Sequence, residues 1–108
     1  MILGSKNSDQ DPLYNKVKRY CRKMSDYSNI TIQNKFNIGY LRAEKILNAL
    51  ENHYYEKAKR IALRTGEARA IKFKRRFRIG YSFAFYLCDL LEAQGIVTSE
   101  NRTPPYGN

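Results

Sequence analysis

AIKFKRRFRIGYSFAFYLCDLLEAQG, at residues 70–95, is the most informative stretch of this 108-residue chain. Its apolar residues recur at helical spacing on both sides of Gly80, and glycine is the residue that most easily takes the left-handed conformation of a tight turn. Gly95 then ends the pattern. The stretch predicts a helix over 70–78, a turn at Gly80 and a helix over 82–94, which is typical of a helix-turn-helix. The same pattern also occurs in small helical bundles with no DNA-binding role.

This plan occurs twice in the chain. Shifting the sequence by 41 residues aligns 12–51 with 53–92 without a gap and gives twelve identical pairs, far more than chance would produce. We interpret this as an internal duplication of a three-helix unit. The further expected elements are a helix over 12–24 with Asp11 as its N-cap, a helix over 30–37, a left-handed turn at Gly39, a helix from Tyr40 onward, and a helix over 54–65.

The two copies end differently. No glycine or proline lies between Leu41 and Thr65, which favours one helix of about 37 Å from the third helix of copy one into the first helix of copy two. The alternative is a kink at Asn52-His53, the weakest point of this stretch. Copy two continues into GIV at 95–97, which predicts a helix end and a short strand, as in a winged helix. The predicted fold class is therefore mainly α, with tandem helix-turn-helix or winged-helix modules, the second with a short wing. The expected organisation is a flexible N-terminus at 1–11, a wingless module at 12–52, a winged module at 53–98 and a tail at 99–108.

The charge balance is strongly basic. Lys and Arg number 20 against 10 Asp and Glu, a formal charge of +10, which favours a polyanionic partner: nucleic acid, or less often a membrane surface. No apolar run is long enough to span a bilayer and the N-terminus does not resemble a signal peptide, so we expect a cytoplasmic protein without a membrane partner. The chain has one His, two distant Cys and no paired carboxylates. We therefore expect no metal site, no cofactor and no enzymatic activity. Both thiols are expected to be buried and inert.

Several motifs are similar to one known family. RRFRIGY at 75–81, followed by EAQGIV at 92–97, resembles the C-terminal gamma domain of the bacterial DNA translocase FtsK. DPLY at 11–14 resembles the opening of that domain, and NKFNIGYLRAEKIL at 34–47 is a second match to its centre. The resemblance implies a bacterial, nucleoid-associated winged-helix protein that binds double-stranded DNA, because family members bind short G-rich, polar DNA sequences. Family members also contact a tyrosine recombinase, which the resemblance implies as a candidate protein partner. No GxxxxGK[ST] phosphate loop is present, so the chain resembles the guide module in two copies, without the motor.

The residues that contact bases in the family are largely replaced in this chain. After the turn the family has Tyr-Asn-Arg-Ala-Ala-Arg and an acid three positions on, and the Asn, the second Arg and the acid contact bases. Copy two has Ser82, Tyr86 and Asp89 at those places, and copy one has Leu41, Lys45 and Asn48. The resemblance therefore implies DNA binding, but not the family's particular target sequence.

Two sets of residues are candidates for contacts with DNA. Six basic residues occur within positions 69–78 with no acid among them, and we expect an anion to bind them, with a solvated cationic face as the alternative. A second basic strip, at 16–23, is interpreted as solubilising. Residues on a polar face of the third helix of copy one could contact guanine or adenine, with ordinary helix surface as the alternative. The phosphate-binding candidates are Arg69, Lys72, Lys74, Arg75, Arg76, Arg78 and Lys35, and the base-reading candidates are Arg42, Lys45, Asn48 and Ser82.

Phe85 and Tyr86 are expected on the exposed face of the last helix, where a DNA-reading helix would carry charge. One interpretation is a protein interface, either for a homodimer or for the recombinase or translocase that the resemblance implies. Two other interpretations are that these side chains pack against copy one, or that they stack on unpaired bases. The alternative function is therefore protein–protein interaction or dimerisation on a gamma-like scaffold that has lost sequence-specific DNA reading.

Overall fold

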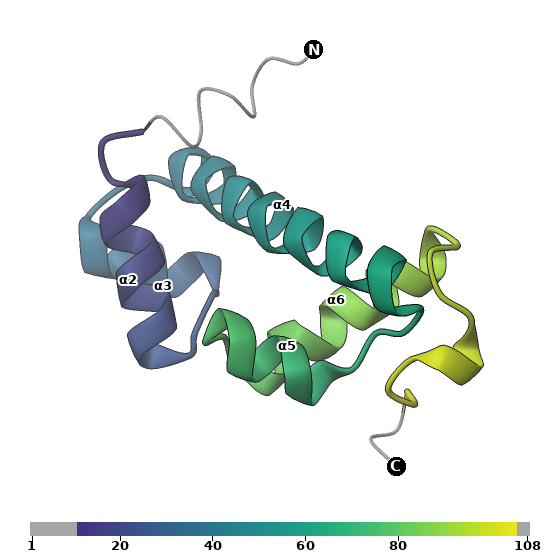
Figure 1. The fold of residues 1–108 in the computed structure, drawn as a ribbon. Helices are drawn as coiled ribbons and strands as arrows, with labels where there is room; N and C mark the ends of the chain where they lie inside the picture. Colours follow the sequence, from purple (N-terminus) through teal and green to yellow (C-terminus); the bar gives the residue numbers. More distant parts are fainter. Residues whose placement is uncertain (1–10, 106–108) are drawn as a thin grey trace. The chain divides into compact units, whose positions relative to one another are not determined.

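A computed structural model describes residues 11–105, and this part of the chain is mainly helical (Figure 1). It contains five α-helices, α2 to α6, one 3₁₀ helix, η1, and no strand beyond an isolated β-bridge. The prediction of a mainly α fold is confirmed. The chain divides into two compact units, with the boundary between His53 and Tyr54.

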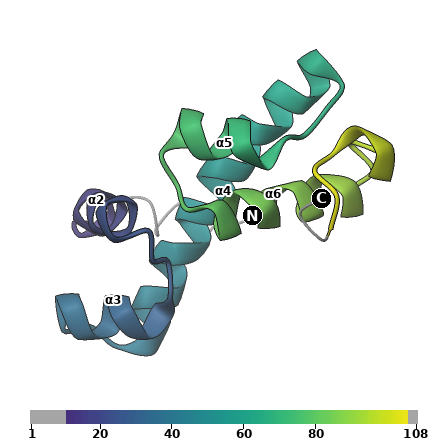
Figure 2. The ribbon, with the colours of Figure 1, turned by 90° about the horizontal axis from the view of Figure 1, so that it is seen from below.

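The first unit is built from α2 (Tyr14–Met24), α3 (Asn29–Phe36) and the first half of α4 (Tyr40–Thr65). Figure 2 shows α2 nearly end-on while α3 runs across the view, so these two helices cross. Apolar residues at helical spacing supply the interior of the unit. Its buried residues include Val17, Cys21, Ile32, Ala43, Ile46 and Leu50.

α2 begins later than the sequence predicts. The expected N-cap, Asp11, instead closes a turn, because its carbonyl oxygen accepts a hydrogen bond from the Tyr14 N–H at 2.9 Å. Its Oδ1 also accepts one from the Leu13 N–H at 2.8 Å. The first helical residue is therefore Tyr14, and the Asp11 carboxylate keeps capacity for a cation.

Gly39 and Gly80, where the sequence analysis predicts left-handed turns, do not take that conformation, whereas Gly95, predicted to end a helix, does, with φ 75°. Gly80 has φ −67° and ψ 159° and is the N-cap of α6, and Gly39 has no positive φ either. The positive φ instead falls on Asn37 (54°) and Arg78 (56°), which are equivalent positions in the two copies. These two residues end α3 and α5 as left-handed C-caps, while the glycines precede the next helix, a position that glycine also favours.

α4 is one uninterrupted helix of 26 residues. Asn52 and His53 are both helical, so the continuity expected from the absence of glycine and proline is confirmed. Gly66, with φ 80°, ends the helix, and its N–H donates to the Ala62 carbonyl at 2.7 Å.

Replacing Gly66 by alanine is expected to lower the free energy of unfolding by about 1 kcal/mol. A Cβ at this position would meet no atom within 4 Å, so the cost comes from the positive φ alone. Urea unfolding followed by circular dichroism measures the change. Leu63→Ala, at an exposed position one turn earlier, is the control and is expected to change stability by less than about 0.5 kcal/mol. Equal stability of G66A and the wild type would contradict the left-handed helix end.

The second unit consists of the end of α4, α5 (Ala70–Phe77), α6 (Tyr81–Ala93) and η1 (Ser99–Asn101). Phe73 and Phe77 stack along α5 with ring centroids 5.7 Å apart, and the ring of Tyr54 lies 5.8 Å from that of Phe77. The helices expected over 70–78 and 82–94 are thus found within one residue of their predicted ends. The helix expected over 54–65 is the last part of α4, which ends at Thr65 as predicted. α5, the turn and α6 form the helix-turn-helix.

The segment after α6 does not form the predicted strand. The Val97 side chain is buried in the unit and η1 follows, so residues 96–97 make no β-pairing. The segment then pairs with the loop before α5 through one parallel β-bridge, between Ala68 and Arg102. The Thr103 N–H donates to the Ala68 carbonyl at 2.9 Å. The wing is thereby reduced to a single bridge.

Candidate nucleic-acid interface

α5 has one buried face and one strongly basic face. Ala70, Phe73 and Phe77 are buried at the spacing of a single helix face. The basic residues occupy the intervening positions and project into solvent. The exposed cations of α5 and of its C-cap are Lys72, Lys74, Arg75, Arg76 and Arg78.

Glu67, just before α5, offsets part of this positive charge, although positions 69–78 themselves contain no acid. It pairs with two of the six basic residues there. Its Oε2 lies 3.2 Å from Lys72 Nζ and its Oε1 lies 3.1 Å from Arg69 Nε. The hydrogen bond from Lys72 and then that from Arg69 lower the pKa of Glu67, which favours its ionised form. The other four of the six basic residues at 69–78 have no acidic partner among residues 11–105; we call them the α5 cluster. They are Lys74, Arg75, Arg76 and Arg78.

Lys35, the phosphate candidate in the first unit, is exposed at the end of α3. Its Nζ lies 5.2 Å from the centroid of the Tyr20 ring, which itself meets the Phe36 ring edge-on at 5.8 Å. A cation–π contact orients an ammonium group without neutralising it. The charge of Lys35 therefore stays open to an anion.

Arg42 is already paired within the first unit. Its Nε and Nη2 donate to the two carboxylate oxygens of Asp11, each at 2.9 Å. The hydrogen bond from Arg42 lowers the pKa of Asp11 and so favours the ionised carboxylate. A guanidinium that makes two hydrogen bonds to a carboxylate uses the same N–H groups that would otherwise contact guanine. Arg42 can contact a base only after it leaves Asp11.

Lys45 and Asn48 follow Arg42 on α4 at the third and sixth positions, and both side chains are exposed. Within the part of the chain that the structure describes, neither has an ion-pair or hydrogen-bond partner. On α4, these two residues are thus the base-reading candidates whose polar groups have no partner within residues 11–105.

Arg102 is buried in the second unit, where it pairs with two acidic residues near the C-terminal end of α6. Its side chain is only 2% exposed, and Nη1 donates to Asp89 at 2.6 Å and to Glu92 at 3.1 Å. Nε donates to the Thr103 carbonyl at 2.6 Å. Asp89, at the position where the family has a base-contacting acid, is therefore held by an internal ion pair. The sequence analysis missed this pair because its partners are thirteen residues apart.

The two aromatic candidates on α6 differ in exposure. Phe85 is half-buried rather than exposed as expected, because the Arg102 guanidinium lies 5.1 Å from its ring centroid. Its ring also stacks on that of Tyr81, at 6.3 Å. Tyr86 is 43% exposed, and a protein interface through it stays a prediction. Ser82, the remaining base-reading candidate, is exposed at the start of α6.

Both cysteines are buried and free of disulfides. Burial raises the pKa of the Cys21 thiol to about 12 and also raises that of Cys88. Both thiols are therefore protonated at neutral pH, as expected for structural cysteines. Residues 11–105 contain no cluster of side chains suited to a metal ion.

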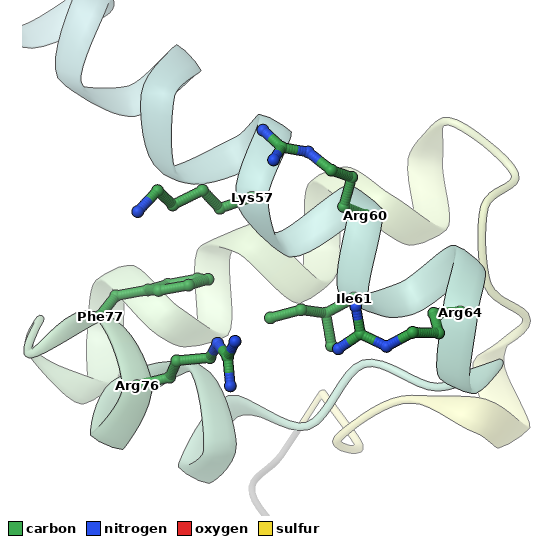
Figure 3. Close-up of a pocket in the computed structure, with 6 residues that line it drawn as sticks. All are labelled: Lys57, Arg60, Ile61, Arg64, Arg76 and Phe77. Carbon is green, nitrogen blue, oxygen red and sulfur yellow. The ribbon is translucent and has the colours of Figure 1, made fainter.

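A cleft that the sequence analysis missed lies in the second unit, between the end of α4 and α5 (Figure 3). It has a volume of about 430 Å³. Three of its basic residues lie at the first, fourth and eighth positions of one helix face, a spacing that could have revealed them in the sequence. The lining residues are Lys57, Arg60, Ile61, Arg64, Arg76 and Phe77.

The fold and its charge define a helix-turn-helix protein whose basic helix precedes the turn. The chain belongs to the FtsK gamma domain family: the model of that family matches residues 8–54 and again residues 51–105, so the resemblance and its two copies are confirmed. The FtsK gamma domain is a DNA-binding domain. No curated protein and no solved structure matches the chain significantly. Between residues 11 and 105, no helix combines the length and the apolar character needed to cross a bilayer.

Proposed function

We propose that this protein binds double-stranded DNA without catalysing a reaction, and that the second unit supplies the anchoring contacts. The observation that carries the proposal is the α5 cluster, whose cations are exposed and have no acidic partner within residues 11–105. In a helix-turn-helix complex the helix before the turn crosses the sugar-phosphate backbone, while the helix after the turn faces the major groove. Cations on α5 are therefore suited to contact phosphates.

α6 is less suited to base reading than the corresponding helix of the family. Asp89 is paired with Arg102, and Tyr86 stands where the family has an arginine. A tyrosine hydroxyl cannot make the two-point hydrogen bond by which arginine selects guanine. Ser82 alone could add a hydrogen bond at the start of the helix.

Base reading is assigned in this proposal to Lys45 and Asn48 on α4. Lysine can donate to the acceptors of guanine, and asparagine can bind adenine through two hydrogen bonds. Arg42 would join them by exchanging the Asp11 carboxylate for a DNA acceptor. Such an exchange conserves the hydrogen bonds of the guanidinium.

The test is fluorescence anisotropy with two duplexes, one selected from a randomised pool and one scrambled, at several salt concentrations. If the α5 cluster contacts four phosphates, log Kd rises with the logarithm of the salt concentration with a slope of about 3.6, which is about 0.9 for each phosphate. Changing Lys45 and Asn48 together to alanine is expected to reduce the preference for the selected duplex about tenfold, because base contacts are lost.

The matched control is Asn52→Ala, at an exposed polar position on the same helix, which is expected to leave the preference unchanged. No duplex binding at low salt would overturn the proposal. Equal binding of both duplexes by the wild type would remove the base-reading role and leave phosphate contacts alone.

A further inference from the structure

The cleft between α4 and α5 concentrates positive charge in a concave site. Lys57, Arg60 and Arg64 line it from α4, and Arg76 lines it from α5 (Figure 3). All four are exposed, and no carboxylate of the part of the chain that the structure describes lines the cleft. Like charges that line one concave surface repel one another and raise the local potential, which an anion relieves.

The first copy provides an internal comparison for the cleft. The positions equivalent to its four cations in the first copy are also basic: Lys16, Arg19, Lys23 and Lys35. The position equivalent to Ile61 is Tyr20. In the first unit the Tyr20 ring packs against Phe36 and lies beneath the Lys35 ammonium. A tyrosine at this position can therefore occupy the space that the smaller isoleucine leaves open between the two helices.

The size and chemistry of the cleft indicate its ligand. About 430 Å³ lies within the range of small-molecule sites, whereas the DNA duplex presents a convex, continuous backbone. Arginine binds phosphate oxygens through two parallel hydrogen bonds, and three arginines are present with one lysine. Ile61 and Phe77 add an apolar wall that does not compete for an anion.

We propose that this cleft binds a compact polyphosphate, such as a diphosphate or triphosphate group, as a site distinct from the proposed duplex-binding surface. The ligand is either a free polyphosphate or the phosphate chain of a nucleotide, since both present several anionic oxygens within a few ångströms. Three of its four cations, all on α4, lie outside the proposed α5 cluster. Only Arg76 belongs to both sets.

The test is isothermal titration calorimetry of the full chain with inorganic tripolyphosphate at physiological salt. One tripolyphosphate per chain is expected. Ile61→Tyr fills the cleft with the residue of the first copy and keeps every charge, so it is expected to weaken tripolyphosphate binding about tenfold or more while duplex affinity stays within about twofold. ATP and adenosine separate the two ligand sources: tighter binding of ATP than of tripolyphosphate indicates a nucleotide, and equal binding indicates the phosphate chain alone.

A second variant keeps the test independent of the folding of I61Y. Arg60→Ala with Arg64→Ala removes two exposed cations and is expected to weaken tripolyphosphate binding about 100-fold, at roughly tenfold per charged contact. The control is Lys16→Ala with Arg19→Ala, which removes equal charge from the first copy and should leave the affinity within about twofold. Unchanged tripolyphosphate binding by I61Y or R60A/R64A would overturn the proposal, and so would a parallel loss of duplex affinity in I61Y. Absence of duplex binding in the wild type would refute the proposed function but leave this test intact.

Discussion

Replacing Lys74, Arg75 and Arg78 together by alanine is expected to weaken duplex binding about 100-fold at 0.1 M salt. The three side chains are exposed on the basic side of α5 and have no acidic partner among the residues that the structure describes. Each phosphate contact that is lost also lowers the slope of log Kd against log salt by about 0.9, so a decrease of about 2.7 is expected. Arg76 is kept because it also lines the cleft, and fluorescence anisotropy across a salt series measures both quantities.

The matched control removes the same charge from the other copy. Lys16, Arg19 and Lys23 are exposed on α2, and their joint change to alanine is expected to weaken binding only a few-fold, through net charge. Both triple variants should unfold at the wild-type urea midpoint, because no substituted side chain is buried. Equal losses of affinity in the two variants would mean that binding follows net charge, and would contradict phosphate contacts by α5.

The helices and the duplication could be predicted because they depend on local sequence. Apolar spacing places α5 and α6 within one residue of their observed ends, and the lack of glycine or proline predicts the length of α4. The family resemblance depends on equally local strings. The left-handed ends of α3 and α5 could not be predicted because the glycine two residues later is the stronger local signal, although Asn37 and Arg78 carry the positive φ.

The details of the candidate site could not be predicted because they depend on contacts between distant residues. Asp11 and Arg42 are 31 positions apart, and their pairing changes Arg42 from a free donor to a committed one. Arg102 and Asp89 form a second such pair, which changes how α6 is interpreted. Composition shows that a charge is present, but only the folded structure shows which partner it has.

Replacing Arg102 by alanine is expected to lower the free energy of unfolding by about 2 kcal/mol. The guanidinium is buried, donates to Asp89, Glu92 and Thr103, and covers the Phe85 ring. Removing one partner of a buried ion pair costs about 3–5 kcal/mol when the other charge is stranded. The cost is smaller in this site because Asp89 and Glu92 are 49% and 38% exposed and can regain water. Urea unfolding followed by circular dichroism measures the change.

Two further variants separate the charge of Arg102 from its shape. Asp89→Asn removes one charge and leaves the bond to Glu92, so a loss of about 0.5–1 kcal/mol is expected. Arg102→Lys keeps the charge but loses the flat contact with Phe85, and should fall between the other two. A wing arginine that contacts DNA would instead lose duplex affinity in R102A with little loss of stability. Because Arg102 is turned inward, folded R102A is expected to bind duplex within about twofold of the wild type, and a large loss of affinity at unchanged stability would contradict its structural role.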